Sequence, residues 1–310
     1  MPRPAPTPLV VLVGPTAVGK TELAAGICRR FGAEVISADS VALYRDLDIG
    51  SAKPTAAERR ETPHHLVDVA DPNHDFSAAD FVRLADQAIA EITARGKRVL
   101  VAGGTGLYVK ALLHGLAPAP PVDQALRASL QRQWEDQGGE ALHRRLAQMD
   151  PAAAGRIHPA DRQRVIRALE VCLQTGRPFS QGQAAHGFQQ VRYPHLMIGL
   201  CRERAELFER IELRCRRMFA QGLVDEVRSL LAAGVDPAAK SLGSLGYAQV
   251  VKMLAGEYDQ AGALEETIKR TKAFAKRQLT WFNKVPGMNW HHPGEAEAIG
   301  ARVAGWWEKE

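Results

Sequence analysis

The stretch Leu9–Thr21, LVVLVGPTAVGKT, decides the fold of this chain. Its first five residues form a continuous apolar run rich in valine, which is typical of a buried parallel strand. The next eight match the pattern G-x-x-x-x-G-K-[ST], whose glycines let backbone N–H groups turn toward phosphate oxygens. The sequence therefore predicts a phosphate-binding loop made of Gly14, Pro15, Thr16, Ala17, Val18, Gly19, Lys20 and Thr21.

The flanking sequence alternates between strand and helix patterns. Short apolar runs predict strands at 35–38, 66–69, 98–102 and 195–200. Apolar residues at helical spacing predict helices at 21–31, 79–94, 204–220 and 264–282. This alternation predicts an α/β fold, a P-loop-type parallel sheet flanked by helices.

The pattern changes at the proline-rich segment 117–121. From there to Gln190 the sequence shows helical periodicity and no convincing strand. We therefore predict a smaller all-helical insertion domain at 119–193, a size compatible with a small folding unit. The α/β core would comprise residues 1–118 and 194–310.

Composition excludes several classes of protein. The chain has 310 residues, of which 45% are hydrophobic and 24% charged, so it is not disordered, a coiled coil or a collagen-like fibre. Lys and Arg number 40 against 35 Asp and Glu, which mildly favours anionic partners. Residues 1–8 are proline-rich, and the apolar run 9–13 is too short to cross a membrane. We expect a cytoplasmic protein without a membrane partner.

Metal sites built from cysteine or histidine are not expected. The four cysteines lie far apart without a C-x-x-C pair, which indicates a reducing compartment and no zinc site. His64-His65 and His291-His292 are adjacent residues, which point to opposite faces of a strand and do not readily share a ligand.

Two carboxylates are candidates for work beside the phosphates. Asp39 ends the predicted strand 35–38, where the ligand crevice of a parallel sheet lies. It could act as a general base or hold magnesium through water, and Asp39 or Ser40 could also be the N-cap of a short helix that follows. Asp68 lies in another apolar run and is either the second acidic element of the phosphate site or a loop-capping carboxylate.

Two segments are strongly basic. Residues 156–177 carry a cluster of arginines, and residues 267–284 combine six Lys and Arg with Phe274, Trp281 and Phe282. Basic residues interleaved with aromatics suit an RNA backbone with stacked bases. A solvated helix face with its aromatics in the core explains the same pattern.

Taken in order, the motifs resemble the tRNA dimethylallyltransferase family, also called tRNA isopentenyltransferases. They are Gly14–Thr21, Ile36–Pro54, His64–Pro72, Gly103–Tyr108, Arg156–Glu170 with Thr175-Gly176, Phe208–Arg214, Leu245–Tyr247 and Ala275–Phe282. The set covers nearly the whole chain. No cysteine follows Cys215, whereas eukaryotic relatives carry a C-terminal zinc finger, so the resemblance is to the bacterial type.

The resemblance implies a prenyl transfer to RNA. A dimethylallyl group would move from dimethylallyl diphosphate to the exocyclic amine of the adenosine immediately 3′ of the anticodon. The tRNAs would be those that read codons beginning with U, and the product would be isopentenyladenosine. The substrates would be the tRNA anticodon stem-loop and dimethylallyl diphosphate, the cofactor Mg²⁺, and the enzyme a monomer.

The resemblance also assigns site residues. Asp39 would be the base on the amine, with Lys20 and Thr105 as further catalytic residues. Arg214 would contact the diphosphate together with the loop, and Thr21 would hold Mg²⁺. The implied tRNA contacts are Asp39, Ser40, Val41, Ala42, Thr105, Arg127, Gln163, Arg164, Val165, Ile166, Arg167, Gly243, Ser244, Leu245, Gly246, Tyr247 and Ala248. Ala42 and Ala248 depart from the family pattern, which has Gln and a basic residue at these positions in many relatives.

Two alternatives share the phosphate loop. A small P-loop kinase of nucleosides or metabolites would use it for ATP, but leaves Gly103–Tyr108 and the arginine-rich insertion unexplained. A non-enzymatic RNA-binding switch would bind ATP or GTP and leave the RNA unchanged. A phosphate loop alone specifies neither the nucleotide nor a reaction.

Overall fold

The computed structural model describes residues 7–309 and divides the chain into two compact units. We call residues up to Leu113 together with those from Arg192 the core unit, and His114–Val191 the insertion unit. The prediction placed the insertion at 119–193, a few residues later at each end. Most of the proline-rich start, residues 1–6, lies outside the described residues.

The core unit is built on a six-stranded parallel sheet with the order β3-β2-β4-β1-β5-β6. Its strands are β1 (Leu9–Val13), β2 (Ala33–Ala38), β3 (His64–His65), β4 (Arg98–Gly103), β5 (His195–Leu200) and β6 (Asn289–His291). The predicted α/β class with a parallel sheet is confirmed.

Helices account for most of the remaining chain. Those of the core unit are α1 (Lys20–Phe31), α2 (Ala56–Glu61), α3 (Ala78–Ala94), α4 (Gly106–His114), α10 (Arg204–Ala220), α11 (Leu223–Ala232), α12 (Tyr247–Leu254), α13 (Gln260–Phe282) and α14 (Ala296–Trp307). Those of the insertion unit are α5 (Gln124–Gln137), α6 (Gly139–Met149), α7 (Pro151–Ala154), α8 (Arg162–Thr175) and α9 (Phe179–His186). None of the described helices is both long and apolar enough to span a membrane.

The predicted strand at 66–69 is wrong. Leu66 and Asp68 have φ of 62° and 58°, in the left-handed region, which breaks an extended strand. The β-structure lies on either side of this segment, as the two-residue strand β3 before it and an isolated bridge between Tyr44 and Ala70 after it. The short edge strand β6 and helix α14 were not predicted.

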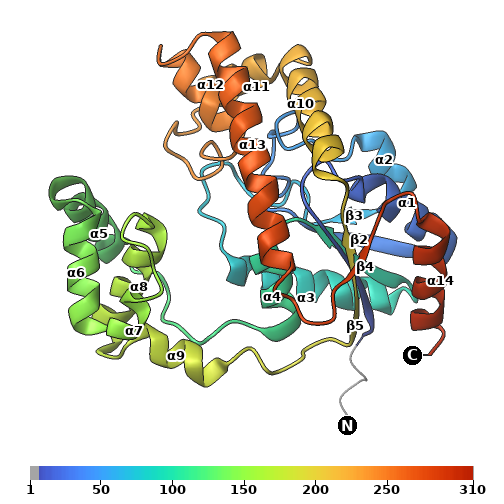
Figure 1. Cartoon of the computed structure of the whole chain (residues 1–310), viewed down its shortest axis with the longest axis horizontal. Helices are drawn as coiled ribbons and strands as arrows, with labels where there is room; N and C mark the ends of the chain where they lie inside the picture. Colours follow the sequence, from blue (N-terminus) through green and yellow to red (C-terminus); the bar gives the residue numbers. More distant parts are fainter. Residues whose placement is uncertain (1–6, 310) are drawn as a thin grey trace. The chain divides into compact units, whose positions relative to one another are not determined.

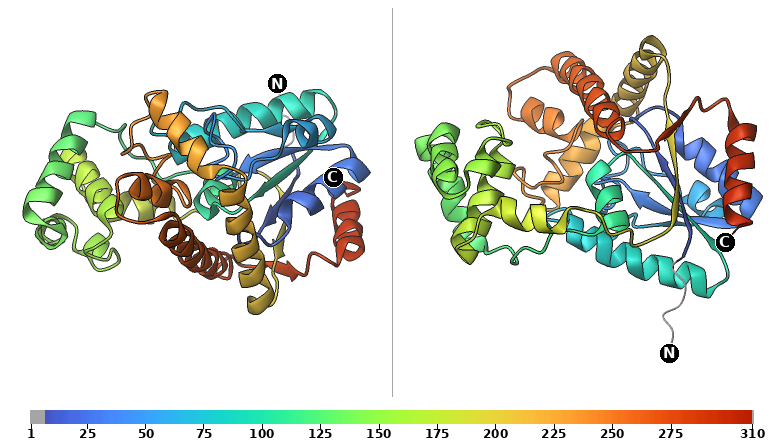
Figure 2. Two further views of the ribbon diagram at one scale, coloured as in Figure 1. Left: turned by 90° about the horizontal axis from the view of Figure 1, so that it is seen from above. Right: turned by 60° about the horizontal axis from the view of Figure 1, so that its bottom comes forward.

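Both faces of the sheet are covered, which explains why β1 is apolar at every position. Leu9, Val11 and Val13 face a core shared with α3, α4 and α11. Val10 and Leu12 face a second core shared with α1, α10 and α14. Figure 1 shows α3 and α4 on the first side, and α1 beside α14 on the other, an arrangement also visible in Figure 2. All five β1 side chains are therefore removed from water.

The insertion unit has its own hydrophobic core. Leu130 of α5, Leu142 and Leu146 of α6, and Val165 and Leu169 of α8 are buried together. These helices are drawn in green in Figure 1. A separate core indicates that the unit holds its shape by its own packing.

Candidate active site

The phosphate loop joins β1 to α1 with the backbone geometry that its glycines predict. Gly14 has φ of 151°, and a Cβ there would lie 2.6 Å from the carbonyl oxygen of Leu200. Gly19 has φ of 111°, a backbone conformation that residues other than glycine rarely adopt. Both positions therefore require glycine, and α1 begins directly after the loop at Lys20.

Lys20 folds back over the loop. Its Nζ donates hydrogen bonds to the carbonyl oxygens of Gly14 (2.9 Å) and Pro15 (2.8 Å). Burial lowers the pKa of Lys20 to about 8, the nearby carboxylate of Asp39 opposes this shift, and the Arg214 guanidinium adds to it. Burial also lowers the pKa of Arg214, against the attraction of Asp39. Two cations and one carboxylate from three elements thus converge beside the loop, an excess of positive charge suited to a diphosphate.

Helix α10 supports the loop from outside. Arg210 donates from Nε to the carbonyl oxygen of Ala17 (2.9 Å), and Arg202, just before α10, donates from Nε to that of Val18 (2.8 Å). Both arginines lie in a basic stretch near Arg214. Because Arg202 and Arg210 bind loop carbonyls, Arg214 remains the predicted arginine contact to the diphosphate in this region.

Gln278 of α13 is a site residue that the sequence argument missed. Its Oε1 accepts from the Thr16 backbone N–H and its Nε2 donates to the Gly104 carbonyl, both at 2.9 Å. The side chain is buried and joins the phosphate loop to the end of β4. The Thr16 N–H is therefore already bonded to Gln278 of α13. Only the hydroxyl of Thr16 is left as a donor that could reach a bound diphosphate. The only available signal was the position of Gln278 within the motif Ala275–Phe282.

Asp39 follows β2 and caps the turn after it. Its Oδ1 accepts from the backbone N–H groups of Val41 (2.8 Å) and Ala42 (3.2 Å). Among the described residues, none donates a hydrogen bond to Oδ2 of Asp39. Asp39 thus caps a turn, and the short helix expected after it is absent, while the second carboxylate oxygen remains available for a substrate.

Thr105 lies next to this turn because the ends of β2 and β4 pair closely. A Cβ on Gly103 would lie 2.1 Å from the Ala38 carbonyl, and the Thr105 N–H donates to that same oxygen at 3.1 Å. The Thr105 hydroxyl accepts from the Ser40 N–H at 3.1 Å. The structure thereby brings the predicted residues Asp39, Ser40 and Thr105 together.

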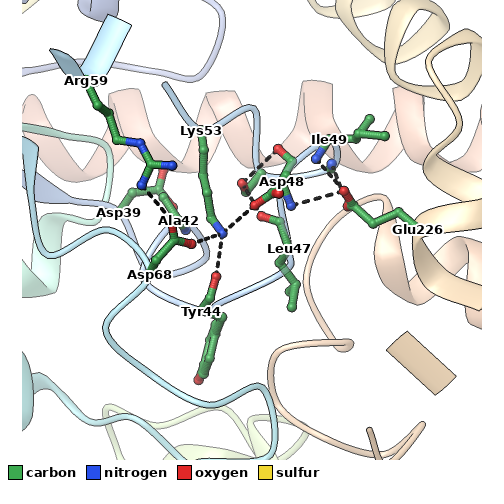
Figure 3. Close-up of polar contacts among 12 residues, drawn as sticks. Asp39, Ala42, Tyr44, Leu47, Asp48, Ile49, Lys53, Arg59, Asp68 and Glu226 are labelled. Carbon is green, nitrogen blue, oxygen red and sulfur yellow. Dashed lines mark hydrogen bonds and ion pairs between the residues drawn. The ribbon is translucent and has the colours of Figure 1, made fainter. Parts of the chain in front are cut away.

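Asp68 is held by two cations. Its carboxylate oxygens contact Nζ of Lys53 and Nη1 of Arg59, each at 2.5 Å, as Figure 3 shows. Burial raises the pKa of Asp68, but the hydrogen bonds from Lys53 and Arg59 outweigh burial and keep this pKa below its ordinary value. Of the two alternatives for Asp68, the structure therefore favours the loop-fastening carboxylate over a metal ligand.

The predicted tRNA contacts of the core unit differ in exposure. Ser40 and Gly243 are exposed, and Val41, Ser244, Leu245 and Ala248 are half-buried. Ala42, Gly246 and Tyr247 are buried. The side chain of Tyr247 is fully buried, and its hydroxyl donates to Glu226 at 2.6 Å. The side chains of Ala42 and Tyr247 do not reach the surface, so a contact of these two residues with RNA would have to use backbone atoms.

The predicted contacts in the insertion unit divide in the same way. Gln163 and Arg164 are exposed on the first turn of α8. Val165 and Ile166 belong to the core of the unit, so their side chains do not face solvent. A helix turns about 100° per residue, so consecutive positions cannot all face one ligand.

Arg127 and Arg167 of the insertion unit meet the fully buried carboxylate of Glu170. Arg127 donates to it from Nε (2.5 Å) and Nη2 (2.9 Å), and Arg167 from Nη1 (3.1 Å). Arg167 also donates to the Pro120 carbonyl at 2.9 Å. These arginines are partly exposed, and they fasten the unit together before any RNA binds.

The basic stretch of α13 is partly neutralised. Lys269 and Arg270 pair with Glu266 of the same helix, and Lys272 pairs with Glu212 of α10. Phe282 is buried, whereas Trp281 is 38% exposed. The explanation as a helix face with a core aromatic is confirmed for Phe282, and the RNA-binding explanation of this segment stays a prediction.

The histidine pairs contact neighbouring protein groups. His65 Nε2 lies 2.7 Å from Glu34, His64 Nδ1 lies 2.6 Å from the Thr62 carbonyl, and His291 Nδ1 lies 3.0 Å from Glu295. Across residues 7–309, no three His, Cys, Asp or Glu side chains gather where they could hold a metal ion.

Comparison with known proteins identifies the family of this chain and confirms its fold class. Residues 42–285 match the protein family described as IPP transferase. The tRNA dimethylallyltransferase of Geobacter sulfurreducens is 48% identical over 94% of each chain, and tRNA dimethylallyltransferase 1 of Pelobacter propionicus is 50% identical over the same share of each.

Solved structures agree. The tRNA isopentenylpyrophosphate transferase of Bacillus halodurans superposes with a TM-score of 0.70 at 38% identity, covering 97% of each chain. A eukaryotic dimethylallyltransferase acting on tRNA gives 0.75 at 26% identity, covering 89% of this chain and 69% of that one. The chain therefore belongs to the IPP transferase family, and its enzyme class is that of the prenyl-transferring enzymes that modify tRNA.

Proposed function

We propose that the enzyme transfers a dimethylallyl group from dimethylallyl diphosphate to the exocyclic amine of an adenosine in tRNA. The adenosine is the one immediately 3′ of the anticodon in tRNAs that read U-initial codons, and the product is isopentenyladenosine. The observation that carries this proposal is the convergence of Lys20, Arg214 and Asp39 beside the phosphate loop.

The cations serve the leaving group. As the amine nitrogen bonds to the first carbon of the prenyl chain, the bond from that carbon to the diphosphate oxygen breaks and pyrophosphate leaves. Lys20, Arg214 and the loop amides stabilise the negative charge that develops on it. The depressed pKa of Lys20 supports this role, because binding of an anion restores full protonation of a lysine that burial has made partly neutral.

Asp39 serves the nucleophile. An adenine amine is a weak nucleophile because its lone pair is delocalised into the ring. Asp39 orients the amine and takes its proton, an effect typically worth about 10²–10⁴-fold in rate. The two hydrogen bonds to Oδ1 fix the carboxylate and leave Oδ2 to face the amine. Thr105, on the neighbouring strand end, lies where it can contact the same nucleoside.

The chain offers groups that suit magnesium. Thr21 is exposed on the first turn of α1, and a Mg²⁺ ion bound at such a site takes most of its ligands from substrate phosphates and water. The residues present therefore fit an ion held mainly by Thr21 and the diphosphate. When bound, it would supply charge neutralisation on the leaving group.

RNA binding draws on both units. The exposed predicted residues are Ser40 and Gly243 in the core unit and Gln163 and Arg164 in the insertion unit. The target base lies in an unpaired loop, so turning it out toward Asp39 costs less than opening a duplex.

The test uses the whole enzyme with magnesium, dimethylallyl diphosphate and unmodified tRNA. The RNA is digested and its nucleosides are weighed by mass spectrometry, with the expectation of an adenosine heavier by one C5H8 unit. Asp39→Asn keeps an oxygen that caps the turn but removes the base, so kcat is expected to fall about 10²–10⁴-fold with tRNA affinity unchanged. Asp46→Asn, an exposed carboxylate of the same loop, is the matched control.

Two results would count against the proposal. Wild-type turnover in Asp39→Asn would remove Asp39 as the base. Unmodified adenosine on a competent tRNA, with ATP consumed instead, would make the loop an ordinary nucleotide site and restore the kinase alternative.

A further inference from the structure

Glu226 of α11 binds the backbone of the loop at residues 47–51. Neither the sequence motifs nor the proposed chemistry gives Glu226 a role. Its Oε2 accepts from the backbone N–H groups of Asp48 (3.1 Å) and Ile49 (2.7 Å), and its Oε1 accepts from that of Gly50 (3.3 Å). Figure 3 shows the carboxylate facing this stretch of backbone. Hydrogen bonds to an ionised acceptor are stronger than neutral ones, so three in succession fix the loop firmly.

Tyr247 completes the arrangement from α12. Its buried hydroxyl donates to Oε1 of Glu226 at 2.6 Å. Its ring lies against Gly50, where an added Cβ would be only 2.4 Å from a ring carbon. The tyrosine therefore orients the carboxylate and sets how closely the loop approaches.

The loop in turn contacts the side chain of Arg214. Ser51 follows Gly50, and its carbonyl oxygen accepts from Nη2 of Arg214 at 3.3 Å. The Ser51 hydroxyl closes the loop by donating to the Leu47 carbonyl at 2.6 Å. Arg214 has a long side chain with many rotamers, so a fixed carbonyl at its tip restricts where the guanidinium lies.

Lys53 fastens the far end of the same loop. Its side chain is only 3% exposed, and its Nζ donates to the Tyr44 carbonyl (2.6 Å) and to Asp48 (2.8 Å) in addition to Asp68. The loop is thus held by two charged side chains, Glu226 and Lys53, which both contact Asp48. Surface loops usually make fewer hydrogen bonds and ion pairs to the rest of the protein, so we expect this loop to be less mobile than most.

We infer that Glu226 and Tyr247 are positioning residues, which hold the Arg214 guanidinium through the 47–51 loop where it meets the diphosphate. The inference rests on the proposed role of Arg214. It also gives buried Tyr247 a part in the reaction that does not require contact with RNA.

The test measures the affinity for inorganic pyrophosphate, the KM for dimethylallyl diphosphate and the Kd for tRNA. In Glu226→Gln an NH2 group, which donates and cannot accept, replaces one carboxylate oxygen. The misplaced arginine is expected to raise the pyrophosphate Kd and the donor KM about tenfold. Tyr247→Phe removes a single hydrogen bond, so the same constants are expected to rise about threefold. The tRNA Kd stays unchanged in both.

Asp225→Asn is the matched control, because it makes the same charge change one residue away on a side chain that is 78% exposed. The decisive comparison is Arg214→Ala with and without Glu226→Gln. If Glu226 acts through Arg214, the second substitution adds almost nothing to the loss of pyrophosphate affinity, because residues that act as one unit are not additive.

Each other outcome is informative. Full additivity, or a weakened tRNA Kd with pyrophosphate binding intact, would overturn the inference. If Arg214→Ala binds pyrophosphate like wild type, the proposed role of Arg214 fails instead. Thermal melting reports whether each variant folds. If Glu226→Gln does not fold, the same comparison is made with Tyr247→Phe, alone and combined with Arg214→Ala.

Discussion

At the scale of single residues, charge in this site is set by burial as much as by sequence. Lys20 lies at the start of α1, half-buried, with its ammonium over the loop carbonyls. Asp39 and Arg214 act on it with opposite sign. A lysine whose pKa is about 8 is only partly charged in mildly alkaline solution, so the empty site and the site with a bound anion differ in protonation.

We predict a specific pH dependence of diphosphate binding. Lys20 is protonated below its pKa of about 8 and neutral above it, so affinity for pyrophosphate is expected to fall as the pH rises through 8. In Lys20→Arg the charge persists, because the guanidinium does not titrate in this range.

Isothermal titration calorimetry in buffers of different ionisation enthalpy counts the protons taken up on binding. Pyrophosphate titrates alike with both proteins, so the difference isolates Lys20. Wild-type enzyme should take up more protons than Lys20→Arg near pH 8.5, and equal uptake would mean that Lys20 stays charged in the empty site.

At the scale of elements, α13 does more than cover the sheet. Gln278 reaches from it to both the phosphate loop and the end of β4, two segments that the chain separates widely. The basic residues of the same helix pair with α10 and with its own first turns. One helix therefore joins the loop, β4 and α10 into a single frame.

Removal of the Gln278 amide should loosen this frame. Gln278→Ala leaves the part-buried Thr16 N–H and the buried Gly104 carbonyl without partners, so the free energy of unfolding is expected to fall by about 1–3 kcal/mol. Pyrophosphate affinity should fall as well, since the loop loses a support. Chemical denaturation and calorimetry measure the two effects, and Gln260→Ala, exposed at the start of the same helix, is the control. Equal stability of the two variants would contradict the prediction.

Helix α8 of the insertion unit allows binding and folding to be separated. Arg164 is exposed, whereas Arg167 contacts buried Glu170. Arg164→Ala is expected to weaken tRNA binding, lower the salt dependence by about one phosphate contact, and leave stability unchanged. Arg167→Ala is expected to lower both tRNA affinity and the melting temperature, because it removes part of a buried ion-pair network.

Binding titrations at several salt concentrations and thermal melts measure these effects. Pyrophosphate affinity, which depends on the core unit alone, should stay constant in both variants. Identical melting temperatures for Arg167→Ala and Arg164→Ala would show that the contact with Glu170 contributes nothing to folding.

At the scale of the whole molecule, the insertion leaves the core unit at two adjacent points. The N–H of Arg192 donates to the Leu113 carbonyl at 2.8 Å, and Arg192 and Tyr193 both bond to Asp86 of α3. The core unit is therefore closed at this junction by its own contacts. The active-site loop, Asp39 and Arg214 all lie within the core unit.

Excision of the insertion should therefore separate the two substrates. A variant with residues 114–191 replaced by a short Gly-Ser linker is expected to fold and to keep its pyrophosphate affinity. Its tRNA affinity is expected to fall by about tenfold or more, because the basic contacts of the insertion are lost. Calorimetry with pyrophosphate and filter binding with tRNA check this. Retained tRNA affinity would place RNA recognition in the core unit alone.

The sequence by itself determined the α/β class, the phosphate loop, the helical insertion and the family. These depend on local patterns, namely the period of apolar residues, two glycines at fixed spacing and motifs in a fixed order. Asp39 could be placed at a strand end for the same reason. The strand predicted at 66–69 failed because two residues adopt left-handed backbone conformations, which apolar character does not reveal.

Only the tertiary structure decided which polar residues face a substrate and which face each other. The family resemblance implies that Arg127, Arg167 and Tyr247 contact RNA, yet each bonds to a carboxylate of the protein itself, which is buried Glu170 for the two arginines and Glu226 for the tyrosine. Gln278 and Glu226 look ordinary, yet each satisfies backbone groups far away in the chain. A hydrogen-bond partner is fixed by three-dimensional packing, and buried polar groups must find one wherever the fold places it.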